Sequence, residues 1–476
     1  MTPRPRLAWT HVRAVPIYTP SIEALVPFIM QCLTKSLSLL AAVAALSLPA
    51  AVQAAEVTLY RDATIIDGTG APAKAHVTLV VDGERIKAIV PASGAGAFEH
   101  GARIADAHGL FVLPGFIDSH VHMATAPDRR YANAFLRRDV YSGITAVRDM
   151  AGDGRFLADL SRAALLGEMP SPDIYYAALM AGPAFFKDPR TIDAARGAVA
   201  GQVPWMRAIT GDSDLKLAVA EAHGTGATGI KIYADLPAAL VSSIASEAHR
   251  QHMLVWAHAA VFPASPREVI DSGADVVSHA CLLAYQVSHP IPPAYHNRPP
   301  VDDGKFADDN PDLDALFADM KARGTILDAT LYVYDAMWRV PHPQPPPYCR
   351  LPLAEKIAAE AHRAGVAVSA GTDAPGSPRD PFPSLFIELS LLVKHAGFTP
   401  MQAIEAATRI GARTIGKSTE MGTIEPGKLA DLLFVARDPL TDIDNIKSVV
   451  MTVKRGRLYR RSEFKPISKD EAASEF

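Results

Sequence analysis

Apolar and polar residues follow two different patterns along the chain, and the pattern changes twice. From Glu56 to about Val112 they alternate at every second position between Gly and Asp turns, which is typical of half-buried antiparallel strands. The segments GTIEPGKLADLLFVARDP and IKSVVMTVKRGRLYRR repeat this pattern near the C-terminus. We therefore predict that residues 55–113 and 419–476 together build one small β-sandwich around an inserted central domain, residues 114–418.

The central residues alternate short apolar runs with helix-like stretches. The expected strands are 115–122, 144–149, 173–180, 229–234, 254–258, 275–279, 325–331 and 366–373. The expected helices are 131–142, 155–166, 213–224, 237–251, 311–323, 353–364 and 383–396. Eight strands joined by crossover helices predict an α/β fold of the (β/α)8 TIM-barrel type. Functional groups of such barrels lie at the C-terminal ends of the strands, so polar residues there are the candidates.

Polar residues with metal-binding side chains stand at these strand ends. His120 and His122 end the first strand, and their imidazoles point the same way because alternate residues of a strand share a face. Lys231 lies in the fourth strand, where an ammonium among apolar residues is costly unless it is neutralised or paired. The fifth, sixth and eighth strands end in His258, His279 and Asp373. This set predicts two divalent metal ions, with Zn2+ favoured by ligand type and manganese, cobalt or iron as alternatives.

These motifs together resemble the amidohydrolase superfamily. The resemblance is carried by GFIDSHVH, the lysine of GIKIY, the strand-end histidines, GTDAP and GTIEPGKLADLLFV, and it spans nearly all of the chain after residue 54. It is nearest to the imidazolonepropionase-like and prolidase-like branch, which includes ochratoxin-type amidohydrolases. The resemblance implies that carbon dioxide carboxylates Lys231 and that this carbamate bridges both metals. It also implies that His120, His122 and Asp373 hold the more buried metal, and His258 and His279 the more exposed one.

The residue types suit the hydrolysis of a C–N bond. A hydroxide that bridges two metals about 3.5–4 Å apart would be the nucleophile. Asp373 would take the proton of the water and deliver it to the leaving nitrogen. Tyr233 shares the strand face of Lys231, so its phenol would either support the substrate carbonyl or pack as a rim aromatic. A one-metal site, with Lys231 paired to an acidic neighbour, stays an alternative.

The resulting prediction is a secreted binuclear metal-dependent amidohydrolase. Its partner would be a small-molecule amide or peptide: a dipeptide, an N-acyl amino acid or an amino-acid-linked toxin such as ochratoxin. A cyclic amidase or lactonase with the same metals and a non-catalytic metal- or solute-binding barrel are the alternatives. The net charge of −4 gives no basic excess for nucleic acid, and a homo-oligomer is expected only by analogy with the family.

The first 54 residues have the pattern of a segment that is removed. From Met30 a head with Lys35 precedes an apolar core, about residues 37–51, and the small-residue end Val52-Gln53-Ala54. These are the three parts of a secretory signal peptide. The core is shorter than the ~20 residues that span a bilayer, so we expect no stable membrane anchor. We predict translation from Met30, cleavage near Ala54 and a secreted or periplasmic protein, with residues 1–29 as an upstream extension.

Three insertions follow the third, sixth and seventh strands. Loops at this face of a barrel hold binding groups, so we expect aromatic pocket walls and a bulky or apolar substrate. The aromatic and imidazole candidates in the first two are Phe185, Phe186, Trp205, Tyr285, His289, Tyr295 and His296. Either Arg298 or Arg339 would hold a substrate carboxylate, and the sequence does not choose between them.

Two further pairs of residues leave their roles open. Asp149 ends the second strand, where it would either orient a metal-site group or form a salt bridge with Arg148. Cys281 and Cys349 are far apart in sequence, and although a secreted compartment permits a disulfide, their spacing does not predict one. Cys281, beside a predicted strand, is expected to be a small buried residue.

Overall fold

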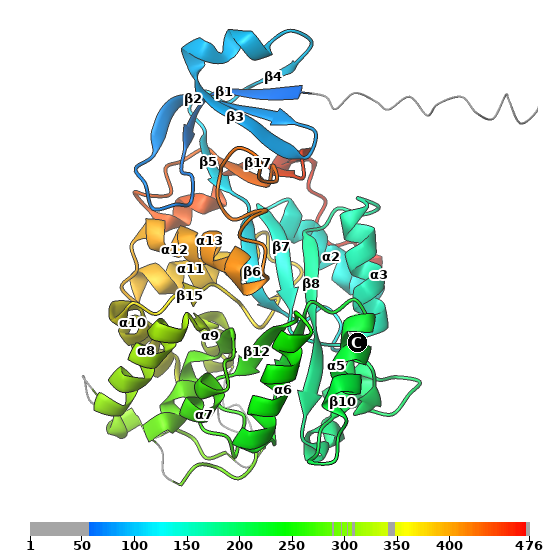
Figure 1. Cartoon of the computed structure of the whole chain (residues 1–476). Coiled ribbons are helices and arrows are strands. Elements are labelled where there is room, and N and C mark those ends of the chain that lie inside the picture. The colour runs from blue at the N-terminus through cyan, green and yellow to red at the C-terminus, as the bar shows by residue number, and fades with distance from the viewer. Residues whose placement is uncertain are drawn as a thin grey trace, which may run out of the picture. The chain divides into compact units, whose positions relative to one another are not determined.

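A computed structural model describes residues 57–472 except 288–289, 297, 302, 307–309 and 341–347 (Figure 1). The predicted upstream extension and signal peptide lie outside the described residues. Within those residues no helix combines the length and the apolar character needed to cross a membrane.

Strands from both ends of the chain build one unit, as predicted, but they form a single sheet rather than two separate layers, and β1 pairs parallel with β4 and β5. Its order is β18-β17-β16-β5-β1-β2-β3, with β4 beside β1. The strands are β1 (Val57–Ile65), β2 (Lys74–Asp82), β3 (Arg85–Pro91), β4 (Arg103–Asp106), β5 (Phe111–Pro114), β16 (Leu432–Val435), β17 (Val449–Lys454) and β18 (Arg457–Arg460). Hydrogen bonding makes them one continuous sheet, in which β5 pairs antiparallel with β16 and so joins the two chain ends. Only Gly115 separates β5 from the first strand of the central unit.

The central unit is the predicted (β/α)8 barrel. Its strands, parallel and in sequence order around the ring, are β6 (Phe116–Val121), β7 (Ile144–Asp149), β8 (Asp173–Ala181), β11 (Gly229–Ile232), β12 (Leu254–His258), β13 (Val276–Ser278), β14 (Ile326–Asp328) and β15 (Val368–Ser369). Each predicted strand range overlaps one of them. Backbone hydrogen bonds from Ser119 to Ala370 and from Asp373 to His120, both 2.9 Å, close the ring between the last strand and the first. Closure brings the ends of the first and eighth strands together.

The seven predicted helices are also present. They are α2 (Arg129–Val140), α3 (Gly154–Leu165), α5 (Leu215–Gly224), α6 (Ala238–Arg250), α8 (Pro311–Arg323), α10 (Leu351–Ala364) and α11 (Leu385–Lys394). Side-chain oxygens of Asp128, Asp153 and Asp214 accept the first backbone N–H groups of α2, α3 and α5, which is how a helix start is satisfied. The helices α3, α6 and α10 bury apolar side chains such as Leu157, Ile244 and Ile357 in the main core and leave their polar residues outside it.

The sequence pattern missed short elements. These are α4 (Pro189–Ala194), α7 (Pro266–Asp271), α9 (Leu331–Trp338), α12 (Pro400–Ala406), α13 (Arg409–Thr414), α14 (Lys469–Ala472) and the hairpin of β9 (Gln202–Val203) and β10 (Met206–Ala208). None of these helices exceeds eight residues, so none shows a helical period over the 11 or more residues that such a pattern needs.

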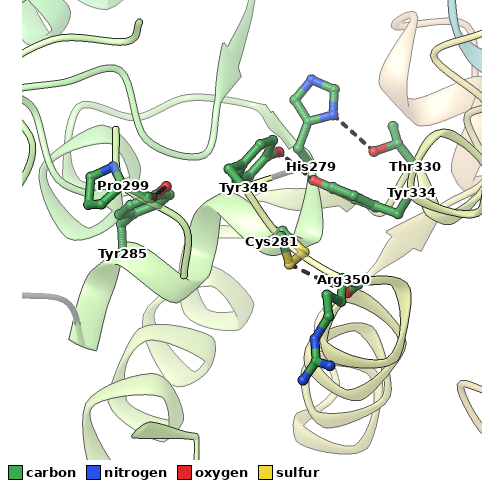
Figure 2. The surroundings of a disulfide bond; sticks show 9 residues. His279, Cys281, Tyr285, Pro299, Thr330, Tyr334, Tyr348 and Arg350 are labelled. Atoms are coloured by element: carbon green, nitrogen blue, oxygen red, sulfur yellow. Dashed lines mark hydrogen bonds between the residues drawn. A yellow bond between two sulfur atoms is a disulfide. The ribbon is translucent and has the colours of Figure 1, made fainter. Parts of the chain in front are cut away.

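Cys281 and Cys349 form a disulfide, which the sequence did not predict (Figure 2). Cys281 is buried, as expected, and lies in the 3-10 helix η3 (Ala280–Val287), directly after His279 and β13. Cys349 lies just before α10. The barrel brings their Cα atoms to 6.1 Å, a proximity that sequence spacing alone cannot reveal.

The double variant Cys281→Ser/Cys349→Ser should have a free energy of unfolding lower by about 2–5 kcal/mol, because the bond restricts the unfolded chain. Urea unfolding without reductant measures the difference. Wild-type protein unfolded with reductant should match the variant, whereas equal stability of the variant and the non-reduced wild type would contradict the prediction.

Candidate metal centre

The predicted ligands of the first and eighth strands converge on one carboxylate. Asp373 Oδ1 lies 3.1 Å from Nε2 of His120 and 3.1 Å from Nε2 of His122. Burial alone would raise the pKa of Asp373, but the neighbouring His120 and His279 hold that pKa well below its usual range. The carboxylate is therefore ionised, as a metal ligand must be.

The other nitrogen of each histidine sets its orientation. His120 Nδ1 donates to Asp328 Oδ2 at 2.7 Å. His122 Nδ1 lies 3.3 Å from the carbonyl oxygen of Ala151, which only accepts. In both imidazoles Nε2 faces Asp373, which is the arrangement of a metal-binding histidine with its supporting partner.

Asp328 is the main site residue that sequence reasoning missed. It ends β14 with its side chain fully buried, and it also accepts hydrogen bonds from Arg148 Nη2 at 2.9 Å and Ser278 Oγ at 3.0 Å. Gly371 packs against it, since a Cβ there would lie 2.3 Å from Asp328 Oδ1. The available signal was an acidic residue inside the seventh predicted strand, 325–331, where a buried charge is costly unless it is paired.

Asp149 supports the turn beside His122. Its carboxylate accepts the backbone N–H groups of Met123 at 2.6 Å and Ala151 at 3.2 Å. The alternative of a salt bridge with Arg148 is wrong, because that guanidinium pairs with Asp328 instead. The orienting role is the one that the contacts support.

Among the predicted metal ligands, two buried nitrogens have no hydrogen-bond partner in the described part of the chain. The Lys231 side chain is fully buried, and its Nζ makes no hydrogen bond to any described residue. Burial, with a smaller effect of Arg148, lowers the pKa of Lys231 to about 7. His258 Nδ1 is also buried and unpartnered, and burial holds the pKa of His258 well below its usual value. Buried polar atoms are normally satisfied, so a neutral imidazole and an unpaired amine here fit a site that takes up a further group.

Lys454 is a buried lysine whose Nζ does have partners. It is the other buried lysine among the described residues. Its Nζ forms an ion pair with Asp173 at 2.6 Å and donates to the carbonyl oxygen of Ala164 at 2.9 Å. The unpaired state of Lys231 is therefore particular to the barrel mouth.

His279 completes the predicted group. One ligand atom each from His120, His279 and Asp373 lie within 4.8 Å of one another. The imidazole of His279 hydrogen bonds through Nδ1 to Thr330 Oγ1 at 2.9 Å (Figure 2), and its ring centroid lies 4.8 Å from that of His258. The structure thus gathers the predicted strand-end residues at one end of the barrel.

These residues open into a cavity of about 790 Å3. Its apolar wall includes Met150, Leu179, Phe185, Met206, Leu282, Val333 and Met337. Of the loop candidates, Phe185, Tyr295 and His296 line it. Phe186, Trp205 and Tyr285 are buried without lining it, and His289 lies outside the described residues. Arg298 lines the cavity whereas Arg339 does not, so Arg298 is the one of the two candidates that borders this space.

Tyr233 borders both the cavity and the metal-site residues. Its ring stacks on Phe185 with centroids 4.5 Å apart and lies 3.9 Å from the ring of His258. Burial raises the pKa of Tyr233 well above its usual value. The phenol is therefore protonated and able to donate a hydrogen bond into the cavity.

Comparison with known proteins agrees with this geometry. Residues 315–459 match the amidohydrolase family. The imidazolonepropionase of Geobacillus kaustophilus is 46% identical over 80 residues, 16% of this chain and 18% of that protein. The ochratoxinase of Aspergillus niger is 33% identical over 113 residues, 23% of this chain and 22% of that protein, so the chain aligns with about a fifth of the length of each relative. The crystal structure of a Xaa-Pro dipeptidase with bound methionine has the same fold, with a TM-score of 0.65 and 24% identity over 85% of this chain and all of that chain.

Proposed function

We propose that this chain, which carries a domain of the amidohydrolase family, is a secreted hydrolase that uses two divalent metal ions to cleave an amide or peptide C–N bond of a small molecule. The observation that carries the proposal is Asp373, whose Oδ1 lies 3.1 Å from Nε2 of both His120 and His122 at the floor of a large cavity. A dipeptide, an N-acyl amino acid or an ochratoxin-like toxin is the expected substrate. The names of the similar ochratoxinase and Xaa-Pro dipeptidase support this class.

The donor set suits two metals. His120, His122 and Asp373 would hold the more buried ion, and His258 and His279 the more exposed one. Lys231, carboxylated by carbon dioxide, would bridge them, which gives its buried and unpartnered Nζ a role. When bound, such ions, with Zn2+ favoured, supply Lewis acidity that lowers the pKa of water and polarises a carbonyl.

Side chains of the protein would transfer the proton and stabilise the substrate carbonyl. Asp373 accepts a proton at its carboxylate and later donates it to the leaving nitrogen. Tyr233 donates its phenol hydrogen to the carbonyl oxygen, where negative charge develops in the transition state. Phe185 stacks on Tyr233 and would hold its ring in place beside the substrate.

Tyr233→Phe should lower kcat by ~10²–10³-fold and change KM little, because the lost hydrogen bond is strongest in the transition state. Steady-state kinetics on a cleaved substrate measures this. Tyr332→Phe, whose phenol does not line the cavity, is the matched control and should keep the wild-type kcat. An unchanged kcat for Tyr233→Phe would leave Tyr233 as a packing residue only.

The proposed function is tested on protein purified after export from the full chain. Metal content per chain is measured alongside hydrolysis of dipeptides, N-acyl amino acids, cyclic amides and lactones. Two metals with cleavage of a linear amide is the expected result. One metal would remove the bridging role of Lys231, and cleavage of cyclic substrates alone would favour a cyclic amidase or lactonase. Absence of both metal and cleavage would overturn the proposal in favour of a binding barrel.

Secretion is part of the same proposal. The disulfide between Cys281 and Cys349 supports it, since such bonds persist in oxidising compartments. N-terminal sequencing of the exported protein should begin near Ala55. A mature protein found in the cytoplasm with residues 30–54 still attached would contradict it.

A further inference from the structure

Arg298 stands in the cavity wall between two aromatic rings. Its guanidinium carbon lies 3.9 Å from the ring centroid of Tyr295 and 4.3 Å from that of Tyr348. Nη1 donates to the carbonyl oxygen of Tyr295 at 2.6 Å. Nε is buried and donates to no described residue. The two rings thus hold the guanidinium plane while leaving donors of its fork unused.

Arg298 differs from the other arginines near the cavity in having no acidic partner among the described residues. Arg190, also in the wall, donates to both oxygens of Asp188, at 3.0 and 2.8 Å. Arg339 pairs with Asp335 at 2.9 Å. A partly desolvated cation without a counter-charge is costly. An anionic group of a bound ligand would supply that charge.

Three hydrogen bonds hold the segments on either side of this arginine in place. The Tyr285 hydroxyl donates to the carbonyl oxygen of Pro299 at 2.6 Å (Figure 2). The backbone N–H of Val301 donates to the carbonyl oxygen of Tyr348 at 2.7 Å. The hydroxyls of Tyr348 and Tyr334 share a hydrogen bond of 2.7 Å. We call Tyr295 and Tyr348, the two rings beside Arg298, the tyrosine clamp. The two segments that carry them are therefore hydrogen bonded to each other and to the helices beside them.

The disulfide connects this clamp to the metal centre. Cys349 directly follows Tyr348, and its partner Cys281 lies two residues after His279. Figure 2 shows Cys281, Tyr348 and His279 in one neighbourhood. A covalent bond at this point keeps one wall of the clamp in place relative to the end of β13, so the guanidinium is positioned before any ligand arrives.

The clamp also reaches the reacting centre. The ring centroid of Tyr295 lies 5.5 Å from that of His258 and 5.5 Å from that of Tyr233. Arg298 is thus separated from these two residues by a single aromatic ring. In an N-acyl amino acid, one carbon separates the scissile nitrogen from a carboxylate, so this group is held close to the bond that breaks.

We propose that Arg298 binds the α-carboxylate of the amino acid that leaves, and that the substrate is an N-acyl amino acid with a free carboxylate. This inference rests on the proposed function and names its substrate class. The planar fork of arginine matches a carboxylate. The apolar wall on Met150, Leu179 and Met206 takes the acyl group.

The test compares one substrate with its neutral analogue. N-benzoyl-L-phenylalanine and its C-terminal carboxamide are offered to the full-chain, exported protein, and benzoate release is measured. Arg298→Gln should lower kcat/KM for the acid by about 10–100-fold, the value of a charge-assisted hydrogen bond, mainly through KM. The kcat/KM for the carboxamide should stay within about twofold. Arg298→Lys should restore part of the loss, because it keeps the charge without the planar fork.

Arg339→Gln is the matched control and should leave both substrates unaffected. Equal losses for the acid and the carboxamide in Arg298→Gln, or no loss for either, would overturn the assignment. If wild-type protein cleaves neither compound, the proposed hydrolysis of this substrate is wrong. Calorimetric binding of N-benzoyl-L-phenylalanine then tests whether Arg298 binds its carboxylate. Binding at least tenfold weaker in Arg298→Gln than in the wild type supports the carboxylate site, and equal or undetectable binding overturns it.

Discussion

Lys231→Ala is expected to lose one of the two proposed metals and nearly all hydrolytic activity. The wild-type side chain is fully buried and its Nζ has no partner among the described residues. A carbamate on this nitrogen would be an anionic ligand to both ions, and alanine offers none. Metal analysis and steady-state kinetics on the purified variant measure both losses.

The cause of the loss can be separated from a folding defect. Removing a buried amine that lacks a partner leaves no unpaired group behind, so the metal-free variant should unfold at a midpoint similar to that of the metal-free wild type. The comparison is made without metal because a bound ion stabilises the folded state by itself. Lys454→Ala is the contrasting variant, because it breaks the ion pair with Asp173. It should lower stability while metal content remains that of the wild type.

Chemical rescue distinguishes a carbamate from an ammonium at position 231. Short carboxylates such as acetate or propionate resemble the end of a carbamate and should enter the space that Lys231→Ala leaves, restoring part of the metal content and activity. Ethylamine would replace an ammonium instead. Rescue by ethylamine and not by carboxylates, or normal turnover of the variant with two metals bound, would contradict the carbamate role.

Most residues of the candidate metal centre could be predicted from the sequence because functional side chains of a barrel lie at the C-terminal ends of its strands. In a (β/α)8 barrel the position along a strand determines which side chains reach the mouth, so His258 and His279 could be placed from the sequence although each stands alone there. The disulfide and the short helices could not be, because they depend on contacts between distant segments or span too few residues to show a period.

The role of Asp328 could not be predicted from the sequence. Its side chain orients His120, a residue 208 positions away in the sequence. The strand predicted over 325–331 extends beyond the observed β14 (Ile326–Asp328), which placed Asp328 inside the strand and hid it as a strand-end group. The sequence left the choice between Arg298 and Arg339 open for a related reason, since the structure is what shows that Arg339 pairs with Asp335 and that Arg298 has no acidic partner among the described residues.

Asp373→Asn is expected to keep the fold and to lower kcat by at least ~10²–10⁴-fold, the range for loss of a positioned acid or base. Asp373 has φ of 59°, a left-handed conformation that asparagine tolerates as well as aspartate does. The amide has nearly the same size as the carboxylate and fits the same space beside His120 and His122. It cannot accept and return a proton, so the transfer to the leaving nitrogen is lost.

Three measurements on Asp373→Asn locate the defect. Thermal unfolding should be close to that of wild type, since the backbone conformation and packing are retained. Metal content should fall less than in Lys231→Ala, because the amide oxygen still offers a weak ligand and four histidines remain. Asp193→Asn, which alters an exposed carboxylate paired with Arg196, should leave turnover unchanged. A fully active Asp373→Asn would remove the proton-transfer role, whereas an inactive variant that keeps its metals would assign the loss to proton transfer rather than to the metal site.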